Sequence, residues 1–388
     1  MTYSVPTLHS PVVKLQDQKS VAQQLSSIAA ARQRSAAAVV RSQTTPSINI
    51  PLTTVSLQGN FDAMVHLTYP GLNGPAIELL VDTGNSSLIV PRYSDIAGLP
   101  NFERDYSILA QNVAEPWQCP AHIIRGPIQI PMQGGGVYEI TDCVFYACTG
   151  ANSKGELTAN FGTGCITPWQ SNGGIVMRSP LSSDANYPFA EFNYAPAQQL
   201  LTAISEPIVD DGSVLTLYKN VPSGYQMFDI KKDCLWMSLI PRSLSIGDTL
   251  TAWPGTIPSI AMIDTGGGPV FLSDPENYLY GHNWPDQTEN PDWTSPDSIS
   301  CQSTFDKITI TIGDESGSFT YSIDTSVLPE SVQGLTLVMC ENCAYMMGNN
   351  GMNVGGLSAL FNYVLVDYAS ARIGLKKKLP TSPGSPTA

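Results

Sequence analysis

The segments Leu79-Leu80-Val81-Asp82-Thr83-Gly84 and Ala261-Met262-Ile263-Asp264-Thr265-Gly266 decide the interpretation of this chain. Each places the tripeptide Asp-Thr-Gly directly after an apolar run. At average residue usage a given tripeptide occurs at roughly 2 in 10,000 positions, so two copies in the same setting would be rare by chance. The repeat indicates two equivalent loops, each of which carries one carboxylate.

The residue types of these two loops suit a shared acid–base site. A buried apolar strand gives each Asp a rigid mount of low dielectric, and the Gly that follows lets the chain turn with backbone amides near the carboxylate. The hydroxyl groups of Thr83 and Thr265 can bond to backbone across a symmetric pair of loops. If Asp82 and Asp264 converge, like charge prevents both from ionising, so the pair holds one proton and can act as acid and base together.

At these residues the sequence resembles the pepsin-like family of aspartic proteases. The likeness continues at Asn85-Ser86-Ser87-Leu88-Ile89-Val90-Pro91 and, far downstream, at Val354-Gly355-Gly356, Val366-Asp367 and Ile373-Gly374-Leu375. Phe161-Gly162-Thr163-Gly164 is a degenerate match to the corresponding apolar-Gly element of the first half. The resemblance covers about residues 55–376.

The resemblance implies a mostly β, bilobed pepsin-like fold, in which two β-barrel-like lobes have the active-site cleft between them. Its function would be that of an aspartic endopeptidase without cofactor or metal, in which Asp82 and Asp264 hold the attacking water. The supporting residues of the loops would be Thr83, Gly84, Asn85, Thr265, Gly266 and Gly267. The partner would be a polypeptide substrate in extended conformation, about eight residues long, with apolar side chains on either side of the cut. We expect a monomer.

Composition favours the same fold class. Of 388 residues, 42% are hydrophobic and only 13% charged, while Gly and Pro number 32 and 30, which suits short strands joined by tight turns. Short runs rich in Val, Ile, Thr and Tyr predict strands at residues 63–68, 144–146, 214–218, 307–312 and 363–366. Because Asp82 and Asp264 lie 182 residues apart, an internal duplication with one Asp in each half is expected.

The domain organisation follows from composition along the chain. Residues 206–213 are polar and turn-rich between apolar segments, and we place the crossover there. The expected parts are a basic N-terminal extension over 1–50, an N-terminal lobe over 51–212, a C-terminal lobe over 213–378 and a disordered tail over 379–388.

The first fifty residues differ in charge from the rest. They hold five Lys and Arg residues and one Asp, which gives a net charge of +4. Because the whole chain has a net charge of −14, the remaining residues carry −18. Residues 17–41 could form a helix. Two interpretations stay open: a prosegment that covers the cleft, as in relatives, or an extension without an inhibitory role.

The sequence contains no secretory signal and no run of roughly eighteen apolar residues, so we expect neither export by that route nor a membrane span. This favours a cytoplasmic location, with non-classical export as the alternative. A net charge of −14 argues against nucleic acid as a partner.

Eight cysteines, at 119, 143, 148, 165, 234, 301, 340 and 343, permit disulfides without requiring any. Relatives often close a loop of the second lobe, which implies a bridge from Cys301 to Cys340 or Cys343. A reducing compartment would leave buried thiols instead. Cys340 and Cys343 have the spacing of half a zinc site, but no matching pair and no nearby His accompany them, so no metal site is predicted.

Three departures from the family pattern bear on function. Asn85 and Gly267 stand where relatives have Ser or Thr, and Ile89 stands where they have Trp. Because Gly267 has no side-chain donor for Asp264, we expect Asp264 to hold the shared proton and activity to be best in mild acid. The region 111–131 is the predicted flap, with Trp117 as the residue that would close the cleft.

Two alternatives to an active protease remain open. The first is a catalytically weak or inactive pepsin-like protein that binds peptides or proteins in the cleft, which the altered flap and Gly267 favour. The second is a β-rich structural or carbohydrate-binding protein in which both tripeptides are accidental.

Overall fold

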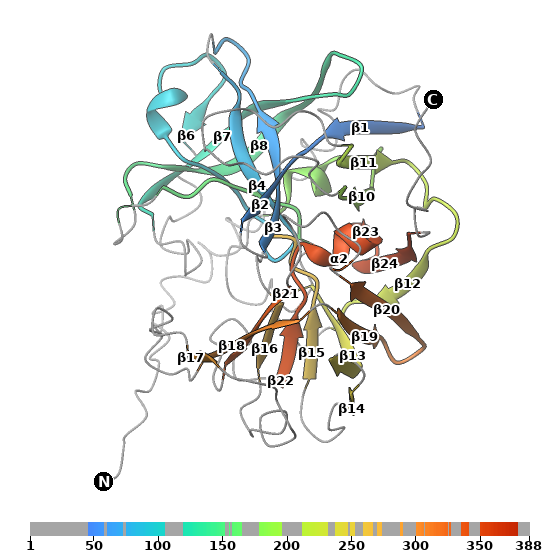
Figure 1. The fold of residues 1–388 in the computed structure, drawn as a ribbon. Coiled ribbons are helices and arrows are strands. Elements are labelled where there is room, and N and C mark those ends of the chain that lie inside the picture. Colours follow the sequence, from blue (N-terminus) through green and yellow to red (C-terminus); the bar gives the residue numbers. More distant parts are fainter. Residues whose placement is uncertain are drawn as a thin grey trace, which may run out of the picture.

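A computed structural model describes residues 46–57, 60–72, 75–104, 119–151, 155, 157–164, 178–195, 212–231, 237–246, 249–252, 259–266, 270–273, 288–289, 300–305, 307–324, 326, 335–340 and 350–378. Over these residues the protein is mostly β, as predicted. They form three sheets, the short α-helix α2 (Leu357–Phe361) and the 3-10 helices η1 (Tyr93–Asp95) and η3 (Pro180–Ser183) (Figure 1).

The first sheet, which we call the N-terminal sheet, has eight strands. They are β2 (Thr53–Leu57), β3 (Asn60–Leu67), β4 (Ile77–Asp82), β5 (Leu88–Val90), β6 (Glu103–Arg104), β7 (Ala121–Pro131), β8 (Val137–Cys148) and β9 (Asn160–Gly162). Their order in space is β2-β3-β4-β9-β5-β8-β7-β6.

The second sheet, the C-terminal sheet, has ten strands. They are β13 (Ser238–Ile246), β14 (Thr249–Ala252), β15 (Ser259–Met262), β16 (Val270–Ser273), β17 (Thr288–Glu289), β18 (Ser300–Phe305), β19 (Lys307–Gly313), β20 (Ser318–Asp324), β21 (Leu335–Cys340) and β22 (Asn350–Asn353). Their order is β17-β18-β21-β16-β22-β15-β13-β19-β20, with β14 beside β13.

The third sheet joins the two halves of the chain. Its strands are β1 (Ser47–Pro51), β10 (Phe189–Asn193), β11 (Val214–Tyr218), β12 (Gln226–Asp229), β23 (Asn362–Asp367) and β24 (Arg372–Lys377), in the order β1-β11-β10-β23-β24-β12. In Figure 1 this six-stranded sheet lies at the right, between the N-terminal sheet above and the C-terminal sheet below. β1 begins at Ser47, a few residues before the expected boundary at 51.

The N-terminal and C-terminal sheets repeat one strand topology. β4 pairs in parallel with β9, β9 pairs antiparallel with β5, and β5 pairs in parallel with β8. In the second half, β15 pairs in parallel with β22, β22 antiparallel with β16, and β16 in parallel with β21. The equivalence places the ends of β4 and β15, where the two Asp-Thr-Gly loops begin, in the same structural position, as an internal duplication predicts.

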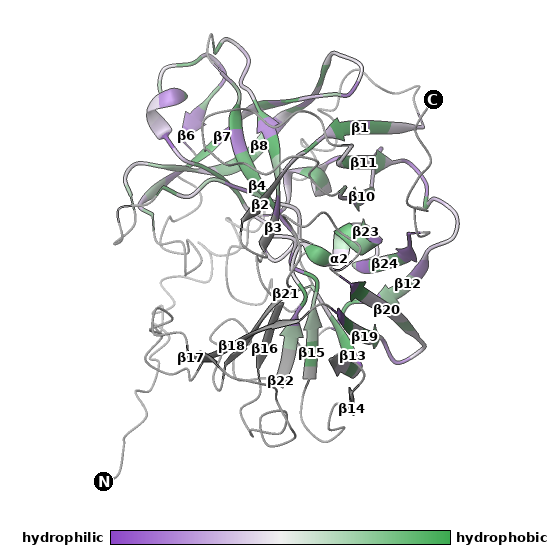
Figure 2. Cartoon of the chain, in the orientation of Figure 1, coloured by the Kyte–Doolittle hydropathy of each residue, from purple (hydrophilic) through white to green (hydrophobic). Residues whose placement is uncertain are grey.

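One continuous hydrophobic core runs through all three sheets. It includes Phe145 and Phe161 of the N-terminal sheet, Phe192 of the six-stranded sheet and Ile310 of the C-terminal sheet, all buried. β19 shows why these segments are strands, since its residues alternate between buried and less buried along its length. Figure 2 shows hydrophobic residues along interior strands such as β15, whereas the edge strand β6 is hydrophilic. The five strands predicted from apolar runs are confirmed in β3, β8, β11, β19 and β23, except that Thr68 follows the end of β3 and forms an isolated bridge with Gln129.

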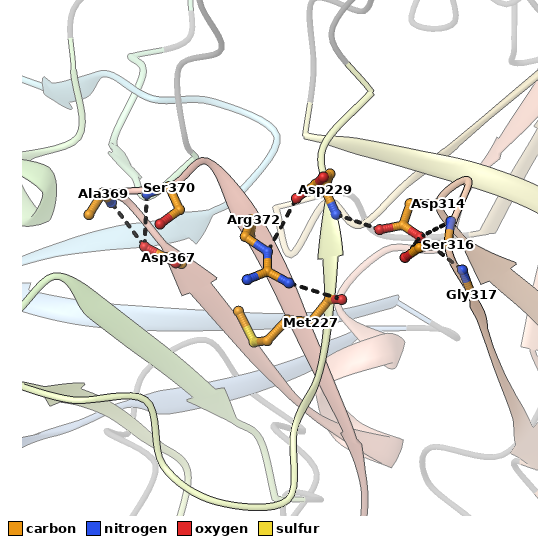
Figure 3. A network of polar contacts seen from close by, with 9 residues as sticks. All are labelled: Met227, Asp229, Asp314, Ser316, Gly317, Asp367, Ala369, Ser370 and Arg372. Atoms are coloured by element: carbon orange, nitrogen blue, oxygen red, sulfur yellow. Dashed lines mark hydrogen bonds and ion pairs between the residues drawn. The ribbon is translucent and has the colours of Figure 1, made fainter.

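A polar network ties the six-stranded sheet to the C-terminal sheet (Figure 3). The Asp314 carboxylate accepts hydrogen bonds from the backbone amides of Asp229 at 2.8 Å, Ser316 at 2.7 Å and Gly317 at 3.0 Å. Arg372 forms an ion pair with Asp229 at 3.2 Å. Asp314 lies in the turn between β19 and β20 and Asp229 ends β12, so this cluster fixes how the two sheets meet.

Several expectations fall partly or wholly outside the described residues. These are most of the N-terminal extension with its helix over 17–41, the crossover apart from 212–213, the tail over 379–388, Trp117 and Gly267. The expected bridge from Cys301 concerns two neighbouring strands: β18 and β21 pair Cys301 with Met339 and Cys340 with Ser300, so the two cysteines are offset by one residue in the register. The side chains of Cys119, Cys143 and Cys148 are buried. No helix among the described residues is long and apolar enough to cross a membrane.

Candidate active site

The two Asp-Thr-Gly loops meet face to face, and each glycine packs on the opposite carboxyl group. A Cβ built on Gly84 would lie 2.5 Å from Cγ of Asp264, and one built on Gly266 would lie 2.6 Å from Cγ of Asp82. No side chain fits at either place. Asp82 is the last residue of β4, and Asp264 follows β15 by two residues, so the duplicated strands bring the two carboxyl groups into contact.

The two threonines hold the loops together across this contact. The Thr83 hydroxyl donates to the carbonyl oxygen of Ile263 at 2.6 Å and accepts from the backbone amide of Thr265 at 3.0 Å. Reciprocally, the Thr265 hydroxyl donates to the carbonyl oxygen of Val81 at 3.0 Å and accepts from the amide of Thr83 at 3.1 Å. Both side chains are buried, so the four bonds form a rigid, symmetric brace of the kind expected from the sequence.

Each aspartate also receives two hydrogen bonds from its own half of the chain. Oδ1 of Asp82 accepts from the amide of Gly84 at 2.7 Å, and Oδ1 of Asp264 accepts from the amide of Gly266 at 3.0 Å. The Oδ2 atoms accept from side-chain amides that sequence reasoning missed: Asn160 donates to Asp82 at 2.6 Å and Asn353 donates to Asp264 at 2.8 Å.

The two asparagines occupy equivalent strands. Asn160 lies on β9, parallel to β4, and Asn353 ends β22, parallel to β15. Both begin an Asn-apolar-Gly triplet, Asn160-Phe161-Gly162 and Asn353-Val354-Gly355. Gly162 is required because a Cβ there would lie 2.3 Å from the backbone nitrogen of Ser87. The repeated triplet is the signal that could have identified both donors.

The side-chain donors Asn160 and Asn353 bear on the positions at which this chain departs from the pepsin-like pattern. Asn85 bonds within its own loop, where its Oδ1 accepts from the backbone amide of Ser87 at 2.7 Å. The expectation that Asp264 lacks a side-chain donor because residue 267 is Gly is wrong, because Asn353 supplies one. Ile89, at the position of the family's Trp, packs in a small buried cluster with Tyr146 and Cys119.

The two carboxyl groups differ in their burial. Asp82 is 4% exposed, whereas Asp264 is half-buried. Burial raises the pKa of Asp82 well above its ordinary value, and the charge of Asp264 and a hydrogen bond between the two carboxyl groups raise it further. The hydrogen bonds from the amides of Asn160 and Gly84 lower this pKa and offset part of the rise. Burial therefore favours the neutral form of Asp82, whereas the expectation from the sequence, which rested on residue 267, placed the shared proton on Asp264.

A third carboxyl group, that of Asp62 on β3, belongs to the same site. Burial raises its pKa to about 6, and the neighbouring charge of Asp264 contributes to the rise. Tyr194, directly after β10, lies near all three carboxyl groups; burial raises its pKa and the three acids raise it further. Neither residue belongs to a sequence motif, so the sequence alone gave no reason to choose them.

The predicted flap is only partly described. Its second half, residues 121–131, is β7, a full strand of the N-terminal sheet in which Ile123, Ile124, Ile128 and Ile130 are buried. That half is therefore part of the packed sheet. Cys119, just before it, is buried beside Ile89. Trp117 lies outside the described residues.

Within the described parts of the chain, no three His, Cys, Asp or Glu side chains are grouped so as to hold a metal ion. The chemistry the site offers is that of two hydrogen-bonded carboxyl groups sharing one proton. A scan against protein-family models and a search of curated proteins found no match to this chain.

Proposed function

We propose that the chain is an aspartic endopeptidase with the bilobed pepsin-like fold. The observation that carries the proposal is the reciprocal contact of the two Asp-Thr-Gly loops, in which each glycine lies against the opposite carboxyl group and each threonine bonds across to the other loop. Such a contact places two carboxyl groups of unequal burial side by side on rigid mounts. This is the arrangement that general acid–base hydrolysis requires.

The unequal burial suggests the division of labour. A water held between the carboxyl groups gives a proton to Asp264, the more exposed partner, as the water oxygen attacks the carbonyl carbon of the peptide bond. Asp82 donates its proton to the carbonyl oxygen, so a neutral tetrahedral intermediate forms. Asp264 then returns its proton to the leaving nitrogen while Asp82 recovers one from the intermediate, and the bond breaks. No covalent intermediate with the protein is formed.

The hydrogen bonds around the pair support this cycle. The amides of Gly84 and Gly266 fix the Oδ1 atoms, and those of Asn160 and Asn353 fix the Oδ2 atoms, so neither carboxyl group has to reorganise when its charge changes. The substrate would be an extended polypeptide, because main-chain recognition of a strand-like segment leaves the scissile carbonyl accessible to the water.

A binding protein without turnover is the alternative, and its main support is weakened. The missing hydroxyl at Gly267 suggested an impaired second aspartate, but Asn353 donates to that aspartate instead. With both carboxyl groups present and each doubly hydrogen-bonded, hydrolysis is the function that the described site supports best.

The test is digestion of a reduced and alkylated polypeptide between about pH 3 and pH 7, with products identified by mass spectrometry. We expect internal cleavage that a statine-containing peptide abolishes, since its hydroxyl group mimics the tetrahedral intermediate. A metal chelator should have no effect. Binding of the statine peptide without cleavage at any pH would favour the alternative function.

A further inference from the structure

The position of Asp62 follows from strand register. β3 and β4 are antiparallel, and Met64 pairs with Leu80. Asp62 stands two residues before Met64 on β3 and Asp82 two residues after Leu80 on β4, so both lie at the same end of this ladder. Since side chains of paired residues share a face, Asp62 and Asp82 project from the same side of the N-terminal sheet.

The surroundings of Asp62 are acidic and poor in hydrogen-bond donors. Its Oδ1 atom is out of contact with solvent and has no hydrogen-bond partner among the described residues. The groups near it are Asp264, from the loop after β15, and Tyr194, directly after β10, while the loop of Asp82 begins at the same end of the β3–β4 ladder. On its own strand, His66 bonds to Thr53 at 3.1 Å instead. No cation among these groups compensates an ionised Asp62.

We propose that Asp62 is a positioning residue for the dyad, a third carboxyl group whose ionisation holds the shared proton on Asp82 and Asp264 and so extends activity toward neutral pH. The proposal rests on the proposed function, since it assigns a pH range to that reaction.

The electrostatic coupling between Asp62 and the dyad acts in both directions. The charge of Asp264 helps to raise the pKa of Asp62 to about 6, so an ionised Asp62 must equally disfavour loss of the last proton from the dyad. Above pH 6 this keeps the dyad in its singly protonated, active form. Below pH 6 Asp62 is neutral and adds no charge. It should therefore move the alkaline limb of the pH profile and leave the acid limb in place.

The experiment is the pH profile of kcat/KM for the parent, Asp62→Asn and the control Glu78→Gln. Glu78 lies on β4 of the same sheet but is exposed, so its charge is screened by solvent. We expect Asp62→Asn to lower the alkaline limb by about one pH unit with the acid limb unchanged, and Glu78→Gln to move neither. Coincident alkaline limbs for the parent and Asp62→Asn would overturn the inference, as would equal movement of both limbs.

A second readout does not depend on turnover. With aspartate carboxyl carbons labelled with ¹³C, one resonance of the parent should titrate near pH 6 and be missing from Asp62→Asn. Its midpoint should fall in Asp264→Asn, where the neighbouring charge is gone. An unchanged midpoint in Asp264→Asn would refute the coupling whether or not the protein cleaves peptides. A parent that shows the coupling but no cleavage would refute the proposed function instead.

Discussion

Asn160 and Asn353 stand in equivalent positions, and each donates its side-chain amide to Oδ2 of an aspartate, Asp82 at 2.6 Å and Asp264 at 2.8 Å. The two bonds come from parallel neighbours of the strands that carry the aspartates, β9 beside β4 and β22 beside β15. The duplication therefore repeats the donors as well as the acids. Because a donated hydrogen bond favours the ionised form of a carboxyl group, these amides set where the pair titrates.

The asparagines should control different limbs of the pH profile. Asn353→Leu removes the side-chain donor to Asp264, and because a donated hydrogen bond favours the charged form of a carboxyl group, the acid limb of kcat/KM should move to higher pH by about one unit. Asn160 lowers the pKa of Asp82, so Asn160→Leu should move the alkaline limb to higher pH. Asn362→Leu is the matched control, since this buried amide bonds to the carbonyl oxygen of Ser358. Unmoved limbs in both test variants would contradict the assigned role.

Alanine at Gly84 should disable the site without unfolding the protein. The added Cβ would lie 2.5 Å from Cγ of Asp264, so this carboxyl group would have to leave the position in which Gly266 and Asn353 hold it. We expect kcat/KM to fall about a hundredfold or more, since small displacements of reacting groups have effects of that size. Gly150→Ala is the control, because its Cβ would meet only Pro120 at 3.3 Å. Parent-like activity of Gly84→Ala would show that the loops do not meet as described.

The threonine brace should contribute to stability. Thr83→Val keeps the side-chain shape but leaves the buried carbonyl of Ile263 and amide of Thr265 without this partner, so the free energy of unfolding should fall by about 2 kcal/mol. Thr83→Ser retains the hydroxyl and should lie close to the parent. Urea unfolding followed by circular dichroism measures both. A loss in Thr83→Ser as large as that in Thr83→Val, or no loss in Thr83→Val, would contradict the assignment of the effect to the hydroxyl group.

The sequence predicted the mostly β class, the strands with strong apolar runs and the two aspartate loops, because each of these is encoded locally. Asp82 and Asp264 could be found because an identical tripeptide follows an apolar run twice. The brace could be anticipated because a hydroxyl group follows each aspartate.

The remaining residues of the site depend on contacts between distant segments. Asn160 and Asn353 reach the aspartates only through parallel strand pairing, and Asp62 only through the register of β3 on β4. The expectation for the shared proton was limited in the same way: it considered residue 267, whereas the burial of Asp82 and the donor from β22 also act on the pair. Residues 121–131 were assigned to a flap because the gain from packing their isoleucines into the sheet cannot be seen in a single segment.

Stability should fall in strong acid through Asp314. Burial opposes its ionisation, but hydrogen bonds from Ser316, Asp229 and Gly317 lower its pKa below the ordinary value. Its contribution is therefore fully present above the unfolded-state pKa and is lost as pH falls through the folded-state pKa. Asp314→Asn should be less stable than the parent at about pH 6, and the difference should shrink toward about pH 2. A difference in unfolding free energy that is constant with pH would contradict this role.

The most direct test of the account is the kcat/KM of Asp82→Asn, Asp264→Asn and the double variant on one peptide substrate, each confirmed as folded by circular dichroism. Because neither carboxyl group can serve as both acid and base, each single variant should lose activity by at least about a thousandfold, and the double variant should be little worse than either. Substantial activity in either single variant, or losses that multiply in the double variant, would contradict a dyad that works as one unit.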